Sequence, residues 1–182
     1  MTGSLTLTAG AAALLAALVA GAAATAGVDA AKSTLVVTFR QENVPVDAPF
    51  KSFNGRIDYD PALPSASKAA LEVATGSLDL GSDDYNTEVR KKDWLDTSAY
   101  PTSTFISTAI KPGGPGHFDA TGILTLKGKT QTLTVPVSVG KAGTSTSFEG
   151  ELQISRSYFN IGSKDWDDTL DEKIRIRFHI IE

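Results

Sequence analysis

The sequence feature that most constrains the fold is a series of three strand-like runs between residues 100 and 139. In the third run, apolar residues occupy every second position from Leu133 to Val139, so one face of an extended segment is apolar. The run at 117–127 alternates in a similar way, and Gly128-Lys129 has the two-residue spacing of a tight hairpin. Pro136 cannot donate a hydrogen bond to a neighbouring strand, which predicts a local irregularity there.

The same alternation recurs along most of the chain. Eight strands are predicted, at residues 33–40, 53–60, 69–76, 100–107, 117–127, 130–139, 147–154 and 173–180. Ser82 precedes acidic residues and then basic ones, an order that suits a helix dipole and predicts one short helix from Asp83 to Leu95. Because no helical crossover separates the strands, the pattern predicts an all-β fold: an eight-stranded antiparallel barrel, whose closure removes exposed edges.

The first 31 residues differ in composition from the rest. They contain one charged residue, Asp29, and an Ala-rich apolar run from Ala9 to Ala24. The run ends in Ala24-Thr25-Ala26, an A-x-A pattern typical of signal-peptide cleavage sites. We therefore expect residues 1–31 to be a signal peptide cleaved near Ala26, residues 32–182 to form the barrel domain, and the product to be periplasmic or secreted. The alternative is a membrane anchor, for which the strongly apolar length of about 20 residues is lacking.

Composition argues against several classes of function. The chain has 17 basic and 21 acidic residues, so no electrostatic footprint for nucleic acid is expected. It has no cysteine, and its two histidines lack metal-binding spacing. No nucleophile elbow, phosphate-binding loop or dinucleotide fingerprint occurs. We therefore expect no catalytic residue, no metal site and no cofactor, and we expect the acid-rich segment 165–172 to be a solvated loop.

Whether the barrel is solid or hollow stays open at the level of sequence. Gly55, Gly122 and Gly150 fall on the apolar face, where they either leave volume in the interior or mark bulges and corners. The apolar face itself suits an ordinary core as well as a tunnel for a hydrocarbon chain. Arg156 continues the inward parity and needs a partner, which is either a ligand head group or an acid such as Asp165 or Asp168.

Five segments carry a resemblance to a known family: Asp93-Trp94-Leu95-Asp96, Tyr100-Pro101, Phe105-Ile106-Ser107, the run from Gly122 to Thr130, and the run from Arg156 to Gly162. With them the chain resembles the YceI-like family of exported bacterial proteins, over about Leu35 to Ile181. The resemblance implies a lipocalin-like barrel that encloses a polyisoprenoid, such as a polyprenyl phosphate or the tail of an isoprenoid quinone.

The chain departs from the commonest family pattern in two places. The segment from Tyr85 to Val89 lacks a histidine that often occurs there, and Trp94-Leu95 replaces an aromatic pair. Together with the segment from Phe159 to Trp166, these departures resemble the subgroup associated with membrane b-type cytochromes.

Two hypotheses follow. The first is an exported, non-catalytic carrier of an isoprenoid lipid, with Arg156 and Trp166 near one mouth of the barrel. The second is a solid barrel that acts as an interaction domain for a membrane b-type cytochrome; a homodimer is a further hypothesis. The expected ligand contacts are Phe39, Phe53, Ile57, Tyr59, Phe105, Leu124, Leu126, Val135, Val137, Phe148, Leu152, Ile154, Arg156, Phe159, Trp166, Ile176 and Phe178.

Overall fold

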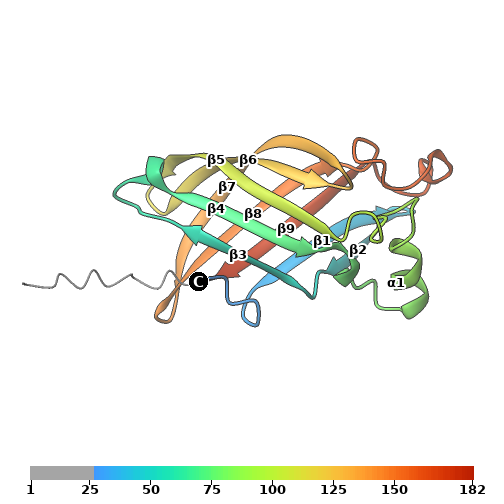
Figure 1. Ribbon diagram of the computed structural model, residues 1–182, viewed down its shortest axis with the longest axis horizontal. Coiled ribbons are helices and arrows are strands. Elements are labelled where there is room, and N and C mark those ends of the chain that lie inside the picture. The colour runs from blue at the N-terminus through green and yellow to red at the C-terminus, as the bar shows by residue number, and fades with distance from the viewer. Residues whose placement is uncertain (1–26) are drawn as a thin grey trace, which may run out of the picture.

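The computed structural model describes residues 27–182 and contains one large antiparallel sheet that curls strongly into a barrel (Figure 1). Its spatial order is β2-β1-β9-β8-β7-β6-β5-β4-β3. The strands are β1 (Thr34–Gln41), β2 (Val44–Pro49), β3 (Phe53–Asp58), β4 (Lys68–Ala74), β5 (Thr102–Gly114), β6 (His117–Leu126), β7 (Lys129–Ala142), β8 (Ser145–Ser155) and β9 (Lys173–Ile181). The predicted all-β antiparallel class is confirmed. The expected signal-peptide run and its cleavage point lie outside the described residues.

The sheet has nine strands rather than the eight predicted, because the sequence pattern missed β2. Pro45 and Pro49 made this segment a poor strand candidate. Proline is tolerated at a sheet edge, and β2 pairs only with β1. The β1–β2 turn consists of Glu42 and Asn43, both in the left-handed region at φ 50° and 66°. A tight hairpin without glycine gave no turn signal.

The barrel is not closed by a continuous ladder, since β2 and β3 are the two edges of the sheet. The segment before β1 crosses this seam: the Val28 amide donates to the Gly55 carbonyl on β3 at 3.0 Å, and the Asp29 amide to the Ile181 carbonyl on β9 at 2.8 Å. The Ile57 amide on the β3 edge donates to the Glu182 carboxylate at 3.1 Å. The bonds to Gly55 and Ile57 satisfy groups on the β3 edge that a closed barrel would pair with another strand.

The β6–β7 hairpin has the two-residue turn that the sequence predicted, one position earlier. The turn residues are Lys127 and Gly128, at φ 48° and 72°. The irregularity predicted at Pro136 takes the form of a ladder end: β7 pairs with β6 from Lys129 to Ser138 without a register shift, but its ladder with β8 begins only at Val137. The part of β7 that precedes Pro136 therefore does not pair with β8.

The predicted helix is present but shorter. Helix α1 (Asp83–Val89) has Ser82 as its N-cap, whose hydroxyl accepts from the Tyr85 amide at 3.5 Å. The prediction of a helix as far as Leu95 is wrong, because after Val89 the chain forms tight turns as far as Leu95, and Asp96 then takes the left-handed φ of 48°. Three 3₁₀ turns complete the structure: η1 (Pro64–Ala66), η2 (Thr75–Ser77) and η3 (Lys164–Trp166). No helix among residues 27–182 combines the length and hydropathy needed to cross a bilayer.

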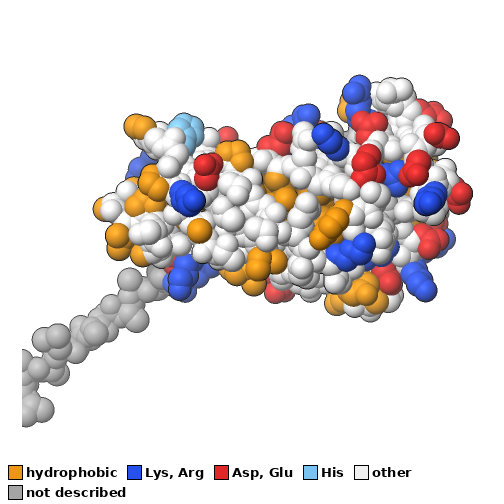
Figure 2. Space-filling view, turned by 90° about the horizontal axis from the view of Figure 1, so that it is seen from above, with side chains coloured by type: hydrophobic (Ala, Val, Ile, Leu, Met, Phe, Trp, Pro, Cys, Tyr) orange, Lys and Arg blue, Asp and Glu red, His pale blue; other side chains and the backbone are white. Residues whose placement is uncertain are grey.

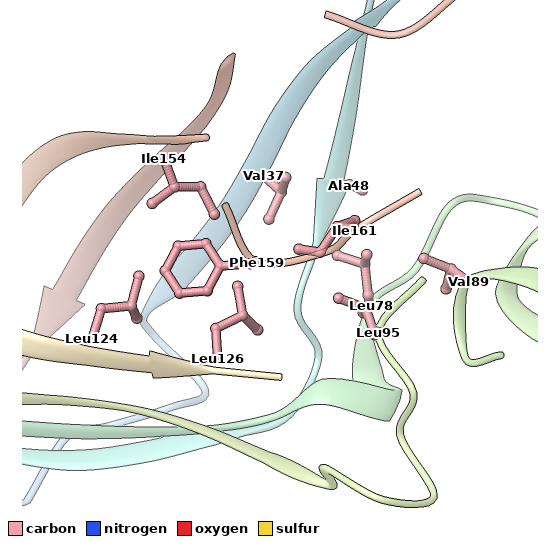
Figure 3. Close-up of a cluster of buried hydrophobic side chains, with 10 residues drawn as sticks. All are labelled: Val37, Ala48, Leu78, Val89, Leu95, Leu124, Leu126, Ile154, Phe159 and Ile161. Atoms are coloured by element: carbon pink, nitrogen blue, oxygen red, sulfur yellow. The ribbon is translucent and has the colours of Figure 1, made fainter. Parts of the chain in front are cut away.

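Buried apolar side chains form two clusters. The cluster nearer α1 centres on Phe159, which packs among Leu124, Leu126 and Ile154 (Figure 3). The other cluster, around Phe118 and Phe148, lies toward the β5–β6 turn. Each cluster contains side chains from several strands, and the barrel interior lies between the two clusters.

Candidate binding cavity

The interior of the curled sheet is hollow. It contains a cavity of about 410 Å³ whose wall is almost entirely apolar. This volume is within the range of about 300–1,000 Å³ that is usual for small-molecule sites. The polar lining residues are few: Gln41, Glu88, Ser103, Thr104, Arg156 and Asp171. A solid core, the alternative left open by the sequence, is therefore not what these strands build.

Most of the sequence-predicted contact residues line this cavity. They are Phe39, Ile57, Phe105, Leu124, Leu126, Val135, Val137, Phe148, Leu152, Ile154, Arg156, Trp166, Ile176 and Phe178. The residues on β7, β8 and β9 follow the alternation that identified them, because every second side chain of a strand points to the same side. The alternation thus located the inner face correctly.

The structure places the other three predicted residues outside the cavity wall. Phe53 packs in the cluster near the β5–β6 turn, and Phe159 is fully buried at the centre of the cluster near α1. Tyr59 stacks on Phe118, with ring centroids 4.8 Å apart, and meets Phe148 edge-on at 6.1 Å. Phe118 and Phe148 line the cavity, so Tyr59 packs against two residues of the cavity wall at that end.

Several lining residues were not predicted. Leu35 and Val37 share the parity of Phe39, and Leu71 and Val73 share the parity of Ala69, so the strand pattern could have found them. Others come from segments with no readable period and close one end of the barrel: Val46, Phe50, Leu78, Leu80, Tyr85, Val89, Trp94, Leu95, Ile161 and Leu170. Only the folded chain brings this second group together.

The three strand glycines do not line the cavity. A Cβ at Gly55, Gly122 or Gly150 would lie 2.4–2.6 Å from a side chain of the neighbouring strand: Leu71, Phe105 or Phe178, respectively. Those three side chains do line the cavity. Each glycine therefore lets a large side chain lie back against the wall. Gly122 also lies opposite a β-bulge, so the expectation of bulges holds there.

The cavity opens at the end of the barrel that carries α1. Tyr85 on α1, Trp166 on η3 and Asp171 line the cavity and are also exposed, which locates the opening. We call this opening, between α1 with its following turns and the loop 156–172, the mouth. Figure 2 shows Lys, Arg, Asp and Glu side chains gathered at this end of the molecule. An apolar cavity thus opens through a charged rim.

Two tryptophans, the only two in the chain, face each other at the mouth. Trp94 and Trp166 meet edge to face with ring centroids 5.1 Å apart, and both line the cavity. The Trp94 indole N–H donates to the Glu88 carboxylate at 3.3 Å. Lys91 lies 2.5 Å from the same carboxylate and is the main cause of its lowered pKa. Glu88 is therefore an anion at the rim.

Arg156 lies in the wall just inside the mouth and is 2% exposed. Its Nη2 pairs with Asp167 Oδ1 at 2.6 Å, and its Nη1 donates to the Ile161 carbonyl at 3.3 Å. The buried Nε has no hydrogen-bond partner. A structural partner was expected for Arg156, but the expected Asp165 or Asp168 is wrong. Asp167 follows the η3 turn in a helical conformation, which directs its carboxylate back to Arg156.

Glu172 fixes the base of the loop 156–172. Burial by itself would raise its pKa, but the hydroxyls of Ser155 and Ser157 donate to its carboxylate and hold the pKa below its usual value. Its carbonyl accepts from the Arg156 amide at 2.9 Å. Among residues 27–182, no three His, Cys, Asp or Glu side chains are grouped to hold a metal ion.

The fold and the cavity define a class of protein: a curled antiparallel barrel whose hollow interior is suited to one slender apolar molecule. The match to known families is equally clear. The chain belongs to the YceI-like domain family, whose pattern matches residues 27–181.

Named relatives come from several bacteria. The chain is 35% identical over 118 residues to a UPF0312 protein of Ectopseudomonas mendocina (strain ymp), covering 62% of each chain. It is also 35% identical over 118 residues to Protein YceI of Escherichia coli O6:H1, covering 62% of this chain and 61% of that one. The chain thus spans a little under two thirds of the length of these relatives. Neither name describes an enzyme.

Solved structures agree with the fold. The crystal structure of Burkholderia cenocepacia BcnA superposes with a TM-score of 0.82 at 40% identity, over 85% of this chain and 99% of that one. A polyisoprenoid binding domain from Saccharophagus degradans, implicated in plant cell wall breakdown, superposes with a TM-score of 0.69 at 16% identity, over 85% and 95%. The second likeness shows the shared fold.

Proposed function

We propose that this protein is an exported, non-catalytic carrier that holds an isoprenoid lipid, either a polyprenyl phosphate or an isoprenoid quinone, inside the barrel. The observation that carries the proposal is the apolar cavity of about 410 Å³, open at one end. A branched hydrocarbon chain would lose its contact with water there, and each buried methylene group contributes about 0.8 kcal/mol. The description of the Saccharophagus degradans domain as polyisoprenoid binding supports the same ligand class.

Export is supported by where the domain begins. The family match starts at residue 27, and Val28 and Asp29 bridge the seam of the barrel. Cleavage near Ala26 would keep both residues in the mature protein. We propose that the mature protein acts in the periplasm or the extracellular medium.

Native mass spectrometry of the full chain, expressed with its own N-terminal segment, tests the proposal directly. The mature barrel should carry an adduct, and lipid extraction should identify it as an isoprenoid. The same spectrum reports mature mass and oligomeric state, and so tests cleavage near Ala26 and the homodimer. A barrel that is always empty and takes up no offered prenyl lipid would refute the carrier function.

A cavity-filling variant links the lipid to this particular space. Ala120 on β6 is buried in the cavity wall, so Ala120→Phe should place a ring in the cavity and lower lipid uptake. Ile123 on the same strand is 40% exposed on the outer face, and Ile123→Phe is the matched control. Equal uptake by both variants would show that the lipid binds elsewhere.

The second candidate function is docking to a membrane b-type cytochrome, in line with the subgroup that the sequence resembles. The observation in its favour is the group of exposed aromatic side chains at the mouth end: Tyr85, Tyr100, Tyr158 and Trp166. Aromatic side chains are enriched in protein interfaces. A partner there would cover the mouth and could exchange lipid with the barrel. Co-purification of a cytochrome that is lost in Tyr85→Ser would support this candidate.

A further inference from the structure

The charge balance at the mouth bears on which isoprenoid the cavity would hold. Among the described residues that line the cavity, Arg156 is the only cation, whereas Glu88 and Asp171 are both carboxylates. A phosphate head group would carry about −1.5 to −2 charges at neutral pH. The question is therefore whether Arg156 is available to such a head group.

The guanidinium of Arg156 is already engaged. Arginine binds phosphate best through two parallel N–H bonds from its planar fork. In this structure Nη2 is paired with Asp167 at 2.6 Å and Nη1 donates to the Ile161 carbonyl at 3.3 Å. A phosphate would have to displace Asp167 or lie beside it, and like charges at close range oppose binding.

Other carboxylates reinforce this compensation. The Glu172 carbonyl accepts from the Arg156 amide at 2.9 Å, and the positive charge of Arg156 contributes to the lowered pKa of the Glu172 carboxyl. Asp171 shares the cavity wall, whereas Glu88, at the opposite side of the mouth, accepts from the Trp94 indole and is itself paired with Lys91 at 2.5 Å. Among the described side chains that line the cavity, the two carboxylates thus outnumber the single guanidinium, a balance that does not favour an anion.

What Arg156 still offers is one buried donor, Nε, with no acceptor. Unpaired buried donors are rare in native proteins, and each costs free energy until it is paired. One N–H matches one oxygen, such as a quinone carbonyl or a hydroxyl. This Nε is buried, so a head-group oxygen pairs with it only where the side chains around Arg156 shift.

From these observations we infer that the mouth selects isoprenoid lipids with an uncharged, hydrogen-bond-accepting head group, and that Asp167 is the residue that determines this selectivity by neutralising Arg156. This inference rests on the proposed function. It narrows the two ligand types of that proposal to the uncharged one.

The test compares a polyprenol, its polyprenyl phosphate and an isoprenoid quinone of equal chain length, each offered to the delipidated mature protein. Binding is followed by tryptophan fluorescence and by mass spectrometry of the retained lipid. The wild type should bind the polyprenol and the quinone about tenfold more tightly than the phosphate, as expected for like charges that are partly screened at a rim. Phosphate binding equal to or tighter than polyprenol binding would overturn the inference while leaving the carrier function intact.

The variant Asp167→Asn frees Arg156 and should bring the phosphate to within about threefold of the polyprenol, while quinone affinity changes little. Asp168→Asn removes the same charge from the exposed neighbouring residue and should keep the wild-type preference. If Asp167→Asn folds poorly, Asp171→Asn at the cavity wall gives a smaller shift in the same direction, and no shift there contradicts the inference. Failure of all three lipids to bind any variant would instead refute the carrier function itself.

Discussion

The packing of Phe178 on Gly150 gives a prediction whose size follows from the structure. A Cβ at Gly150 would lie 2.4 Å from Cζ of Phe178 and 2.7 Å from the Pro136 carbonyl oxygen. Carbon atoms in contact normally stand about 3.5–4.0 Å apart. In Gly150→Ala the ring must therefore shift by about 1 Å or more, since the contact is short by that amount. Overpacking of this kind costs about 1–3 kcal/mol.

Because Phe178 lines the cavity, the displaced ring moves toward the space that the lipid would fill. Gly150→Ala should thus lower both the free energy of unfolding and lipid uptake. Gly113→Ala in β5 is the control, since a Cβ there meets no atom closer than 3.4 Å. Urea unfolding followed by tryptophan fluorescence measures the stability of both variants.

A double-mutant cycle with Phe178→Ala isolates the ring from the backbone. Removing the ring should reduce the cost of Gly150→Ala by about 1 kcal/mol, a coupling typical of residues in contact. A residual cost remains from the Pro136 oxygen. If Gly150→Ala costs the same with and without the ring, the glycine serves only the backbone, and the reasoning about cavity shape is wrong.

Three further predictions follow from the mouth. Ser82→Ala should destabilise α1 by about 0.5–1 kcal/mol, the lower part of the range for N-caps because the hydrogen bond is long; urea unfolding measures this. The folded-state pKa of Glu172 lies below its unfolded value, so its contribution to stability is present above the unfolded pKa and is lost as pH falls through the folded pKa. In Glu172→Gln the free energy of unfolding should therefore decline less steeply with falling pH. An unchanged decline would contradict this. The variants Trp94→Phe and Trp166→Phe each keep one tryptophan, and the fluorescence emission of both should change when lipid binds. A variant whose emission does not change would show that the lipid lies away from its remaining tryptophan.

The sequence predicted the strands whose alternation is undisturbed. From β6 to β9 the inner face was identified residue by residue, because a strand that is buried on one side must alternate. Strand β2 was missed because the rule against proline holds for central strands and says nothing of an edge. The helix was extended too far because its charges suit a dipole in any register, whereas the turns after Val89 depend on packing against the barrel end.

The mouth was the least predictable part of the site. Arg156 was recognised as an inward-facing cation, but its partner depends on how the η3 turn orients Asp167, which no strand period encodes. Likewise, Trp94 and Trp166 come from segments far apart in the chain and meet only when the loop 156–172 folds over the barrel end. Local patterns describe the wall of such a barrel better than its opening.

The stretch that crosses the seam matters for anyone who prepares this protein. Val28 and Asp29 precede the first strand, yet their amides donate hydrogen bonds to β3 and β9 on one side of the barrel. A recombinant version that starts at Lys32 would leave the carbonyls of Gly55 and Ile181 without these donors, and we expect its barrel to be less stable. A purification tag is better placed ahead of residue 27 than fused at the first strand.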